Sequence, residues 1–393
     1  MKQYRLIRFA TFLVSFCILF ATTNSPCPPT PRKPLPMPPP PPDPYPNIGP
    51  STGLLSPSPP PQPPKNVTVP AVFVFGDSLV DTGNNNNIST PLRCNFRPYG
   101  INFVKGVPTG RYCDGKVPSD FLAEFLGIKP VVPAYLDPRL QPDDLITGVC
   151  FASGGSGYMP LTPKYLNVIP MSDQLTYFQQ YIARVKKLVG QEKGDQIIAN
   201  GLAIVIAGSN DVGITYFGPG AQWVKDDIYS FTSKLVDSAA SFAMQLYGYG
   251  ARHIGVAGIT PLGCIPAQRT LKGGHHRNCA QDVNDVAQLF NSKLSIALGQ
   301  LAKNLPGSKL IFIDIYSPFS QILENHADYG FEVIKQGCCG TGLVETGPLC
   351  NQETSSVCSN ISAYLFWDSL HPSHRFYEIL TKILVKKYIP LLF

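Results

Sequence analysis

The chain has 393 residues, with 32 lysines and arginines against 26 aspartates and glutamates, and a formal net charge of +6. The charge falls to +3 without residues 1–23, because that segment carries Lys2, Arg5 and Arg8. A balance this small does not predict nucleic-acid binding, so that class of function is set aside.

Residues 1–23 predict a secretory signal peptide. Three basic residues precede an apolar run over residues 9–21, and small residues follow it. A membrane anchor is the alternative, but this run is shorter than the roughly 20 residues that span a bilayer. We therefore expect cleavage near residues 21–24, a secreted, extracellular protein, and no transmembrane segment in the mature chain.

Residues 24–68 predict an extended linker. Positions 26–64 hold 20 prolines in 39 residues, a composition that favours polyproline II and offers little apolar surface for a core. The segment is either a semi-rigid spacer or an attachment to the extracellular matrix and cell wall, and the sequence alone favours the spacer.

Residues 69–393 predict one α/β domain. Apolar strand-like runs alternate with longer amphipathic runs, which is typical of a parallel sheet covered on both faces. The expected strands are residues 71–75, 149–152, 203–207, 254–259 and 310–315. The expected helices are residues 119–126, 173–189, 222–247, 282–301, 318–326 and 373–388.

Ten cysteines and three sequons follow residue 23. In a secreted chain, disulfides are the expected state of cysteine. Short loops would join Cys264 to Cys279 and pairs among Cys338, Cys339, Cys350 and Cys358. A zinc site fits the last group less well, because no C-x-x-C spacing occurs in the chain. N-glycosylation sequons begin at Asn66, Asn87 and Asn360.

Three expected strands end in small polar turns. The first ends in Gly76-Asp77-Ser78, the second in "SGGSG" at residues 153–157, and the third in "GSND" at residues 208–211. Ligands bind beyond the carboxyl ends of parallel strands, so these turns would meet at one edge of the sheet. Ser78 by itself is equally explained as a helix cap or a turn residue.

His371 is the candidate base for a serine nucleophile. In "FWDSLHPS", Asp368 precedes His371 by three residues, a spacing that lets a carboxylate orient an imidazole. The other ring nitrogen could then accept the proton of a serine hydroxyl. The alternative for Asp368 is an N-cap of the last helix. A metal pair of His371 and His374 fits less well, because Pro372 separates them.

The other two turns offer donors for an oxyanion. A backbone N–H of the glycine turn and the side-chain amide of Asn210 are suitable groups, although both also fit ordinary turns. The stretch "GRYCDGKV", residues 110–117, has the spacing of a phosphate-binding loop. It has Val117 where a serine or threonine should bind magnesium, and no apolar strand precedes it, so we do not expect a phosphate site.

Together these motifs resemble the plant GDSL esterase/lipases of the SGNH hydrolase superfamily. "FGDSLVDTGNN", "FASGGSGY", "AGSNDVG" and "FWDSLHPS" look like four blocks of that family, in order. "PTGRYCDGKVPSDFLAEFLG" resembles a signature of its plant branch. The proline-rich segment ahead of the domain is similar to the layout of the anther-specific proline-rich proteins and extracellular lipases.

The resemblance implies a flavodoxin-like three-layer α/β/α sandwich with a five-stranded parallel sheet. It implies Ser78 as nucleophile, His371 as base and Asp368 as its orienting partner, with no metal or cofactor. The Ser78 N–H, the Gly155 N–H and the Asn210 amide would form the oxyanion hole. Gly154 fits the place of Gly155 equally well by counting. Cys150 stands where the family's second block usually has asparagine, so we expect an altered hydrogen bond beneath the oxyanion turn.

We therefore expect a secreted serine esterase/lipase that hydrolyses lipid or acyl esters through an acyl-enzyme on Ser78. One alternative is a matrix-associated protein whose catalytic domain is idle. The other is an acyltransferase that uses the same three residues to transfer the acyl group to an alcohol.

Overall fold

The computed structural model describes residues 68–353 and 355–393. The expected signal peptide, the proline-rich positions 26–64, Cys27 and Asn66 lie outside the described residues. The main sheet has four parallel strands, ordered β1-β2-β3-β4. Their bounds are β1 (Val72–Gly76), β2 (Leu202–Ile206), β3 (His253–Ala257) and β4 (Lys309–Ile313).

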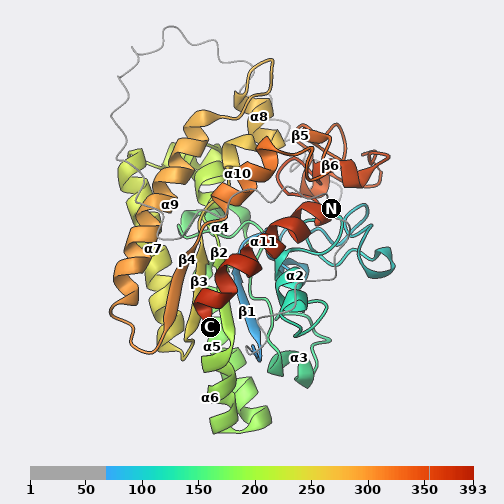
Figure 1. Cartoon of the computed structure of the whole chain (residues 1–393). Coiled ribbons are helices and arrows are strands. Elements are labelled where there is room, and N and C mark those ends of the chain that lie inside the picture. Colours follow the sequence, from blue (N-terminus) through green and yellow to red (C-terminus); the bar gives the residue numbers. More distant parts are fainter. Residues whose placement is uncertain (1–67, 354) are drawn as a thin grey trace. The chain divides into compact units, whose positions relative to one another are not determined.

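Helices cover both faces of this sheet, as Figure 1 shows. Side chains alternate along a strand, so Phe73 and Phe75 pack on one face against α5 (Met171–Val189) and α7 (Ile228–Gly248). Val72 and Val74 belong to the core on the other face, together with residues of α2 (Pro118–Phe125) and α11 (His374–Leu392). This arrangement confirms the three-layer α/β/α architecture.

The expected fifth strand, residues 149–152, is not a regular strand of the sheet. Four backbone hydrogen bonds hold the stretch from Thr147 to Ser153 beside β1, but only one parallel bridge forms, between Val74 and Cys150. Gly148, at φ 92°, bends the chain before the segment, and the glycine turn bends it again afterwards. Cys150 also pairs with Ala134 on its other side. The main sheet of the described residues therefore has four regular strands and an irregular edge.

The six expected helices are present, with one clear shift. The helix expected from residue 222 begins at Ile228, because Asp227 caps it by accepting the Ser230 N–H at 2.8 Å. Besides α2, α5, α7 and α11, the predicted helices correspond to α9 (Gln281–Ala302) and α10 (Tyr316–Glu324). Helices not expected from the sequence are α3 (Pro142–Ile146), α4 (Leu161–Leu166), α6 (Gln191–Asn200) and α8 (Pro266–Lys272). Short turns of helix are η1 (Asn84–Asn87), η2 (Val104–Gly106), η3 (Asp211–Tyr216), η4 (Pro219–Trp223), η5 (Leu262–Cys264), η6 (Gly347–Leu349) and η7 (Ile361–Ala363).

A second, two-stranded parallel sheet pairs β5 (Val333–Gly337) with β6 (Tyr364–Phe366). Disulfides join Cys338 to Cys358 and Cys339 to Cys350 in the segment between these strands, and a third joins Cys264 to Cys279. The short-loop disulfides expected from the sequence are thus confirmed. Cys94, Cys113 and Cys150 remain buried free thiols.

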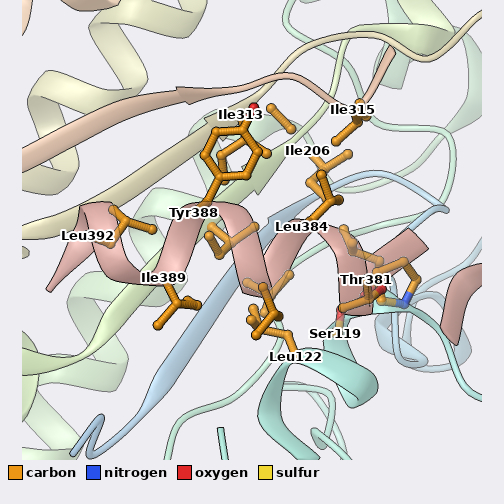
Figure 2. A pocket seen from close by; sticks show the side chains of 16 residues that line it. Ser119, Leu122, Ile206, Ile313, Ile315, Thr381, Leu384, Tyr388, Ile389 and Leu392 are labelled. Atoms are coloured by element: carbon orange, nitrogen blue, oxygen red, sulfur yellow. The ribbon is translucent and has the colours of Figure 1, made fainter. Parts of the chain in front are cut away.

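An apolar cavity of about 60 Å³ lies between α11, α2 and the main sheet (Figure 2). Three side chains with hydroxyl groups, those of Ser119, Thr381 and Tyr388, line it among mostly aliphatic residues. The Ser119 hydroxyl donates to the Val80 carbonyl oxygen at 2.6 Å. The Thr381 hydroxyl is buried and has no hydrogen-bond partner among the described residues.

None of the described helices combines the length and the apolar character that a bilayer crossing needs.

Candidate active site

Ser78 lies in the turn directly after β1, at the carboxyl edge of the main sheet. Gly76 has a φ of 137°, and a Cβ at this position would lie 1.8 Å from the Ile206 carbonyl oxygen, so the turn requires glycine. Asp77 caps the turn, because its Oδ1 accepts the N–H two residues further on at 3.0 Å. The Ser78 hydroxyl is instead directed to His371, with Oγ 2.9 Å from Nε2.

Asp368 and His371 lie in a tight turn directly after β6. Both oxygens of Asp368 are 2.9 Å from His371 Nδ1. Asp368 Oδ1 also accepts the backbone N–H groups of Leu370 at 2.8 Å and of His371 at 2.7 Å. Asp368 therefore caps its own turn, and the alternative that it caps the last helix is wrong, because α11 begins at His374 after Ser373.

His374 does not join His371. Its Nδ1 accepts the backbone N–H of Lys116 at 2.8 Å, and its ring packs against Phe121 with 5.0 Å between ring centroids. The two histidines thus have different partners, and His374 holds the segment ahead of α2 in place. No group of three or more His, Cys, Asp or Glu side chains among the described residues could hold a metal ion.

The Asp368 carboxylate is fully buried and fully hydrogen-bonded. Its Oδ2 accepts the hydroxyls of Tyr99 at 2.7 Å and Thr346 at 3.0 Å. Burial by itself would raise the pKa of Asp368, but the charge of His371 and the hydrogen bonds from His371, Tyr99 and Leu370 outweigh it and leave the pKa below its usual value. Asp368 is therefore a carboxylate, able to stabilise a protonated His371.

Two of the backbone N–H groups in the turns of the candidate site have no partner within the described part of the chain and are candidates for the oxyanion hole. They are the N–H groups of Ser78 and Gly155. Gly154 differs, because its N–H donates to Asp81 Oδ2 at 2.9 Å. Gly155 has a φ of 89°, which the tight turn requires. Of the two glycines that counting could not separate, only Gly155 has an N–H free to bind a substrate atom.

The third turn is tied to the glycine turn by two side chains. Asn210 Nδ2 donates to the Ser156 carbonyl oxygen at 2.8 Å, which uses one of its two amide hydrogens. Asp211 accepts the N–H groups of Tyr158 at 2.8 Å and Met159 at 2.9 Å, and the Thr162 hydroxyl at 2.6 Å. These bonds place Asn210 beside the segment that carries Gly155.

Three further buried aspartates surround the site. Burial raises the pKa of Asp77 to about 7, against the opposing effects of the Leu79 N–H and of His371. Burial also raises the pKa of Asp81 and of Asp211 to about 6, although each accepts several hydrogen bonds. Asp77 Oδ2 has no partner among the described residues. All three lie in the sequence motifs. Aspartate is common in turns, however, so the sequence alone did not distinguish them from ordinary turn residues.

The expectation for Cys150 needs correction. Its thiol donates to the Val80 carbonyl oxygen at 3.2 Å, so it supports the turn that carries Ser78 and not the glycine turn. Burial raises the pKa of the Cys150 thiol to about 12, which keeps the group protonated and a donor. Side chains alternate in direction along residues 149–152. The Cys150 side chain therefore points to the turn that carries Ser78.

Tyr99 and Thr346 were not identified from the sequence. Both belong to irregular segments, Tyr99 269 residues and Thr346 22 residues from Asp368 in the sequence, and neither has a motif around it. Of the predicted glycosylation sites, Asn87 and Asn360 are both exposed.

Residues 72–384 match the model of the family described as GDSL-like Lipase/Acylhydrolase. The match covers all four strands of the main sheet and the whole of the candidate site.

Curated relatives cover most of the described part of the chain. GDSL esterase/lipase At1g20120 of Arabidopsis thaliana is 57% identical over 321 residues, which are 82% of this chain and 80% of that protein. Anther-specific proline-rich protein APG of the same plant is 54% identical over 84% of this chain and 63% of its own length. GDSL esterase/lipase EXL3, also from Arabidopsis thaliana, is 54% identical over 83% of this chain and 89% of its own length.

Proposed function

This chain belongs to the family of GDSL-like lipases and acylhydrolases and is a carboxylic ester hydrolase; on that premise, we propose that it acts through an acyl-enzyme on Ser78. The observation that carries the proposal is the continuous contact from Ser78 Oγ through His371 to Asp368, each step 2.9 Å long. Lipid or other acyl esters are the proposed substrates.

In the proposed acylation step, Ser78 Oγ attacks the ester carbonyl carbon while His371 Nε2 takes the hydroxyl proton. Asp368 holds the ring through Nδ1 and stabilises the imidazolium that forms. The carbonyl oxygen becomes an oxyanion, for which the N–H groups of Ser78 and Gly155 and the second amide hydrogen of Asn210 are the proposed donors.

Collapse of the tetrahedral intermediate then breaks the bond to the alcohol oxygen. His371 returns its proton to the leaving alcohol, which departs and leaves the acyl group on Ser78. A water molecule, deprotonated by the same ring, attacks the acyl-enzyme and releases the carboxylic acid.

Hydrolysis of short- and long-chain p-nitrophenyl esters by the wild type and by Ser78→Ala tests the proposal. We expect Ser78→Ala to lower kcat by at least about 10⁴-fold. Ser238→Ala is the matched control, since Ser238 lies on α7 and its hydroxyl donates to the Lys234 carbonyl oxygen. Equal rates for the wild type and Ser78→Ala would reject the proposal, and an idle catalytic domain would give no rate above buffer.

Acyl transfer uses the same residues and is separated by its products. With an alcohol acceptor present, a hydrolase of this kind releases mainly the free acid, whereas a transferase releases mainly the new ester. Chromatographic analysis of the products distinguishes the two.

We also propose that the protein is secreted. Three disulfides within the described residues and the exposed sequon residues Asn87 and Asn360 support this, because both features suit an oxidising, extracellular compartment. Expression in plant cells followed by N-terminal sequencing should give protein in the medium that begins between residues 21 and 25. Retention in the cell with Met1 intact would contradict it.

A further inference from the structure

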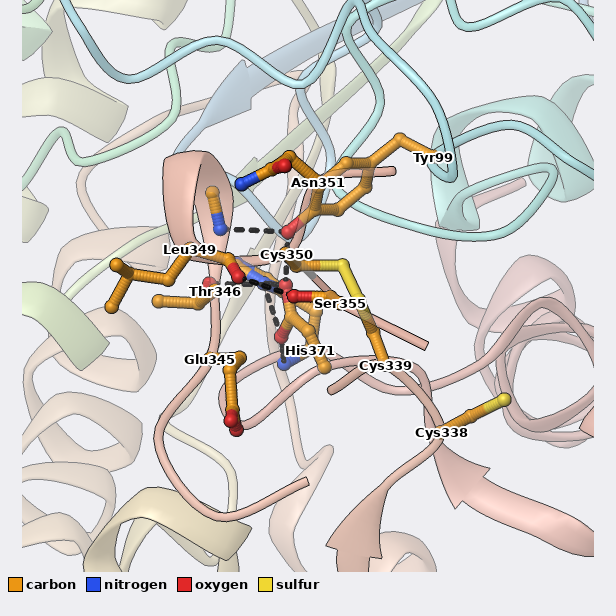
Figure 3. The surroundings of a disulfide bond; sticks show 12 residues. Tyr99, Cys338, Cys339, Glu345, Thr346, Leu349, Cys350, Asn351, Ser355 and His371 are labelled. Atoms are coloured by element: carbon orange, nitrogen blue, oxygen red, sulfur yellow. Dashed lines mark hydrogen bonds and ion pairs between the residues drawn. A yellow bond between two sulfur atoms is a disulfide. The ribbon is translucent and has the colours of Figure 1, made fainter. Parts of the chain in front are cut away.

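Tyr99 links Asp368 to the loop around Gly347, although Tyr99 lies far from both in the sequence. The Tyr99 hydroxyl donates to Asp368 Oδ2 at 2.7 Å and accepts the Gly347 N–H at 2.7 Å. Thr346, the neighbour of Gly347, donates its hydroxyl to the same Oδ2 at 3.0 Å. Figure 3 shows Tyr99 and Thr346 beside His371, next to the disulfide of Cys350.

These two hydroxyls complete the hydrogen bonding of the carboxylate. Oδ1 accepts the two backbone N–H groups of its own turn, and Oδ2 accepts the two hydroxyls. A carboxylate offers about four lone-pair directions, so the donors fix its plane as well as its position. Without Tyr99 and Thr346, Oδ2 would keep only its contact with His371, and the carboxylate could rotate about its own side chain.

Separate parts of the fold hold the two hydroxyls. The Tyr99 ring is fully buried and packs edge-on against Trp367, with 6.1 Å between ring centroids. Thr346 lies in the loop of residues 339–350, which the Cys339–Cys350 disulfide closes. Two backbone bonds fasten this loop to the Asp368 turn, from Cys339 N–H to the Trp367 oxygen and from Ser369 N–H to the Glu345 oxygen, each 2.9 Å.

The buried tyrosines and thiols around Asp368 keep their protons near neutral pH. Burial raises the pKa of Tyr99 well above its usual value, so Tyr99 stays a donor. Burial does the same for the other groups that interact electrostatically with Asp368, which are Cys94, Tyr112, Cys113 and Tyr377. Asp77 faces His371 and titrates near 7. Asp77 is unchanged in all the variants below, so differences in activity between these variants arise from the contacts of Asp368.

We propose that Tyr99 and Thr346 are positioning residues of the Asp368–His371 pair, delivered by two segments outside the motifs. The inference rests on the proposed function, because it assigns them a role in holding the orienting carboxylate. Neither hydroxyl contacts Ser78 among the described bonds, so each acts through Asp368.

Steady-state kinetics of Tyr99→Phe and Thr346→Val test the proposal. Loss of a hydrogen bond to a charged group should lower kcat by roughly 10- to 100-fold for Tyr99→Phe and less for Thr346→Val, with KM within about twofold. Charge on Oδ2 is then less dispersed and favours imidazolium, so the acid limb of the kcat/KM profile moves to higher pH. Thr346→Val leaves the Tyr99–Gly347 hydrogen bond intact. This variant therefore tests the proposal if Tyr99→Phe folds poorly.

A double-mutant cycle separates an effect of Tyr99 on the Asp368 carboxylate from an effect on the stability of the whole domain. Asp368→Asn removes the charge that Tyr99 positions, so adding Tyr99→Phe to it should change kcat by less than about twofold. Tyr181→Phe is the matched control, because Tyr181 is an equally buried tyrosine whose hydroxyl donates to the Leu145 carbonyl oxygen in the core. It should lower the unfolding temperature without moving the acid limb.

Titration of the His371 ring by NMR tests the positioning role without requiring that the protein hydrolyse an ester. An upward shift of its midpoint in Tyr99→Phe and Thr346→Val supports the positioning role, even if the wild type hydrolysed no ester tested. An active wild type whose acid limb and His371 midpoint stay unchanged in both variants would overturn it. Fully additive losses in the Asp368→Asn background would also overturn it.

Discussion

Two buried aspartates interact electrostatically with His371, and their pKa values shift in opposite directions although burial raises both. Asp368 accepts hydrogen bonds on both oxygens, and its pKa lies below the usual value. Asp77 accepts one, leaves Oδ2 without a partner among the described residues, and has a pKa of about 7. The charge of His371 and the larger number of donors thus keep Asp368 ionised, whereas burial with a single donor raises the pKa of Asp77.

Asp77→Asn should change how stability depends on pH. An unfolded chain loses this proton near pH 4, whereas the folded protein keeps it until about pH 7. The unfolded state binds fewer protons in that window, so the free energy of unfolding falls as pH rises, by at most about 4 kcal/mol from this group. Asn cannot ionise and still offers Oδ1 to the Leu79 N–H. We expect urea denaturation to show Asp77→Asn gaining on the wild type from pH 5 to pH 8.

Asp237→Asn is the control for this titration, because Asp237 is an exposed aspartate on α7. Its difference from the wild type should be the same at both pH values. A constant difference for Asp77→Asn as well would contradict the assignment of a raised pKa to Asp77.

At the scale of elements, the sequence predicted the parts with regular periodicity. Buried strands such as β1 and long amphipathic helices such as α9 are recognisable because one pattern continues over many residues. The segment 149–152 was overpredicted, since its apolar run could not reveal the bends at Gly148 and the glycine turn. The strand β5 was missed because it is half exposed and contains Lys335 and Gln336.

The residues of the candidate site also fall into a group that the sequence predicted and a group that it missed. Ser78, Asn210 and His371 were predicted from the sequence because each stands at an expected strand end or in a short motif. Tyr99 and Thr346 approach Asp368 through loops, where no period links a residue to its partner. Only the three-dimensional path of the disulfide-closed loop shows that they meet.

The packing of α11 on the sheet offers a stability test at the apolar cavity. Thr381→Val keeps the side-chain shape and removes a buried hydroxyl that has no partner among the described residues. We expect it to raise the free energy of unfolding by about 1 to 2 kcal/mol. Ser119→Ala, on α2 at the same cavity, should lower it by about 1 kcal/mol, because that hydroxyl donates to Val80. Chemical denaturation measures both, and destabilisation by Thr381→Val would show that its hydroxyl has a partner.

At the scale of the whole molecule, the fold gathers turns from separate strands and a distant loop at one edge of a single sheet. The hydrophobic clusters on both faces, and the cluster around Tyr99 and Trp367, consist of residues between Val69 and Leu392. The hydrogen bonds described for the candidate site likewise join residues of this part of the chain. We therefore expect catalysis to depend on the described domain and the proline-rich positions to affect location.

Deletion of residues 24–67, with residues 1–23 kept for export, tests this separation of roles. Because the hydrophobic clusters and the site contacts described above are formed by residues from Val69 onward, kcat/KM on a soluble p-nitrophenyl ester and the unfolding temperature should both stay unchanged. If the proline-rich positions attach the protein to the cell wall, the fraction retained in washed walls should fall while activity in the medium rises. Unchanged retention would leave them the role of a spacer. A loss of kcat/KM would instead show that the segment contributes to the folded domain, against the division of the chain near residue 69.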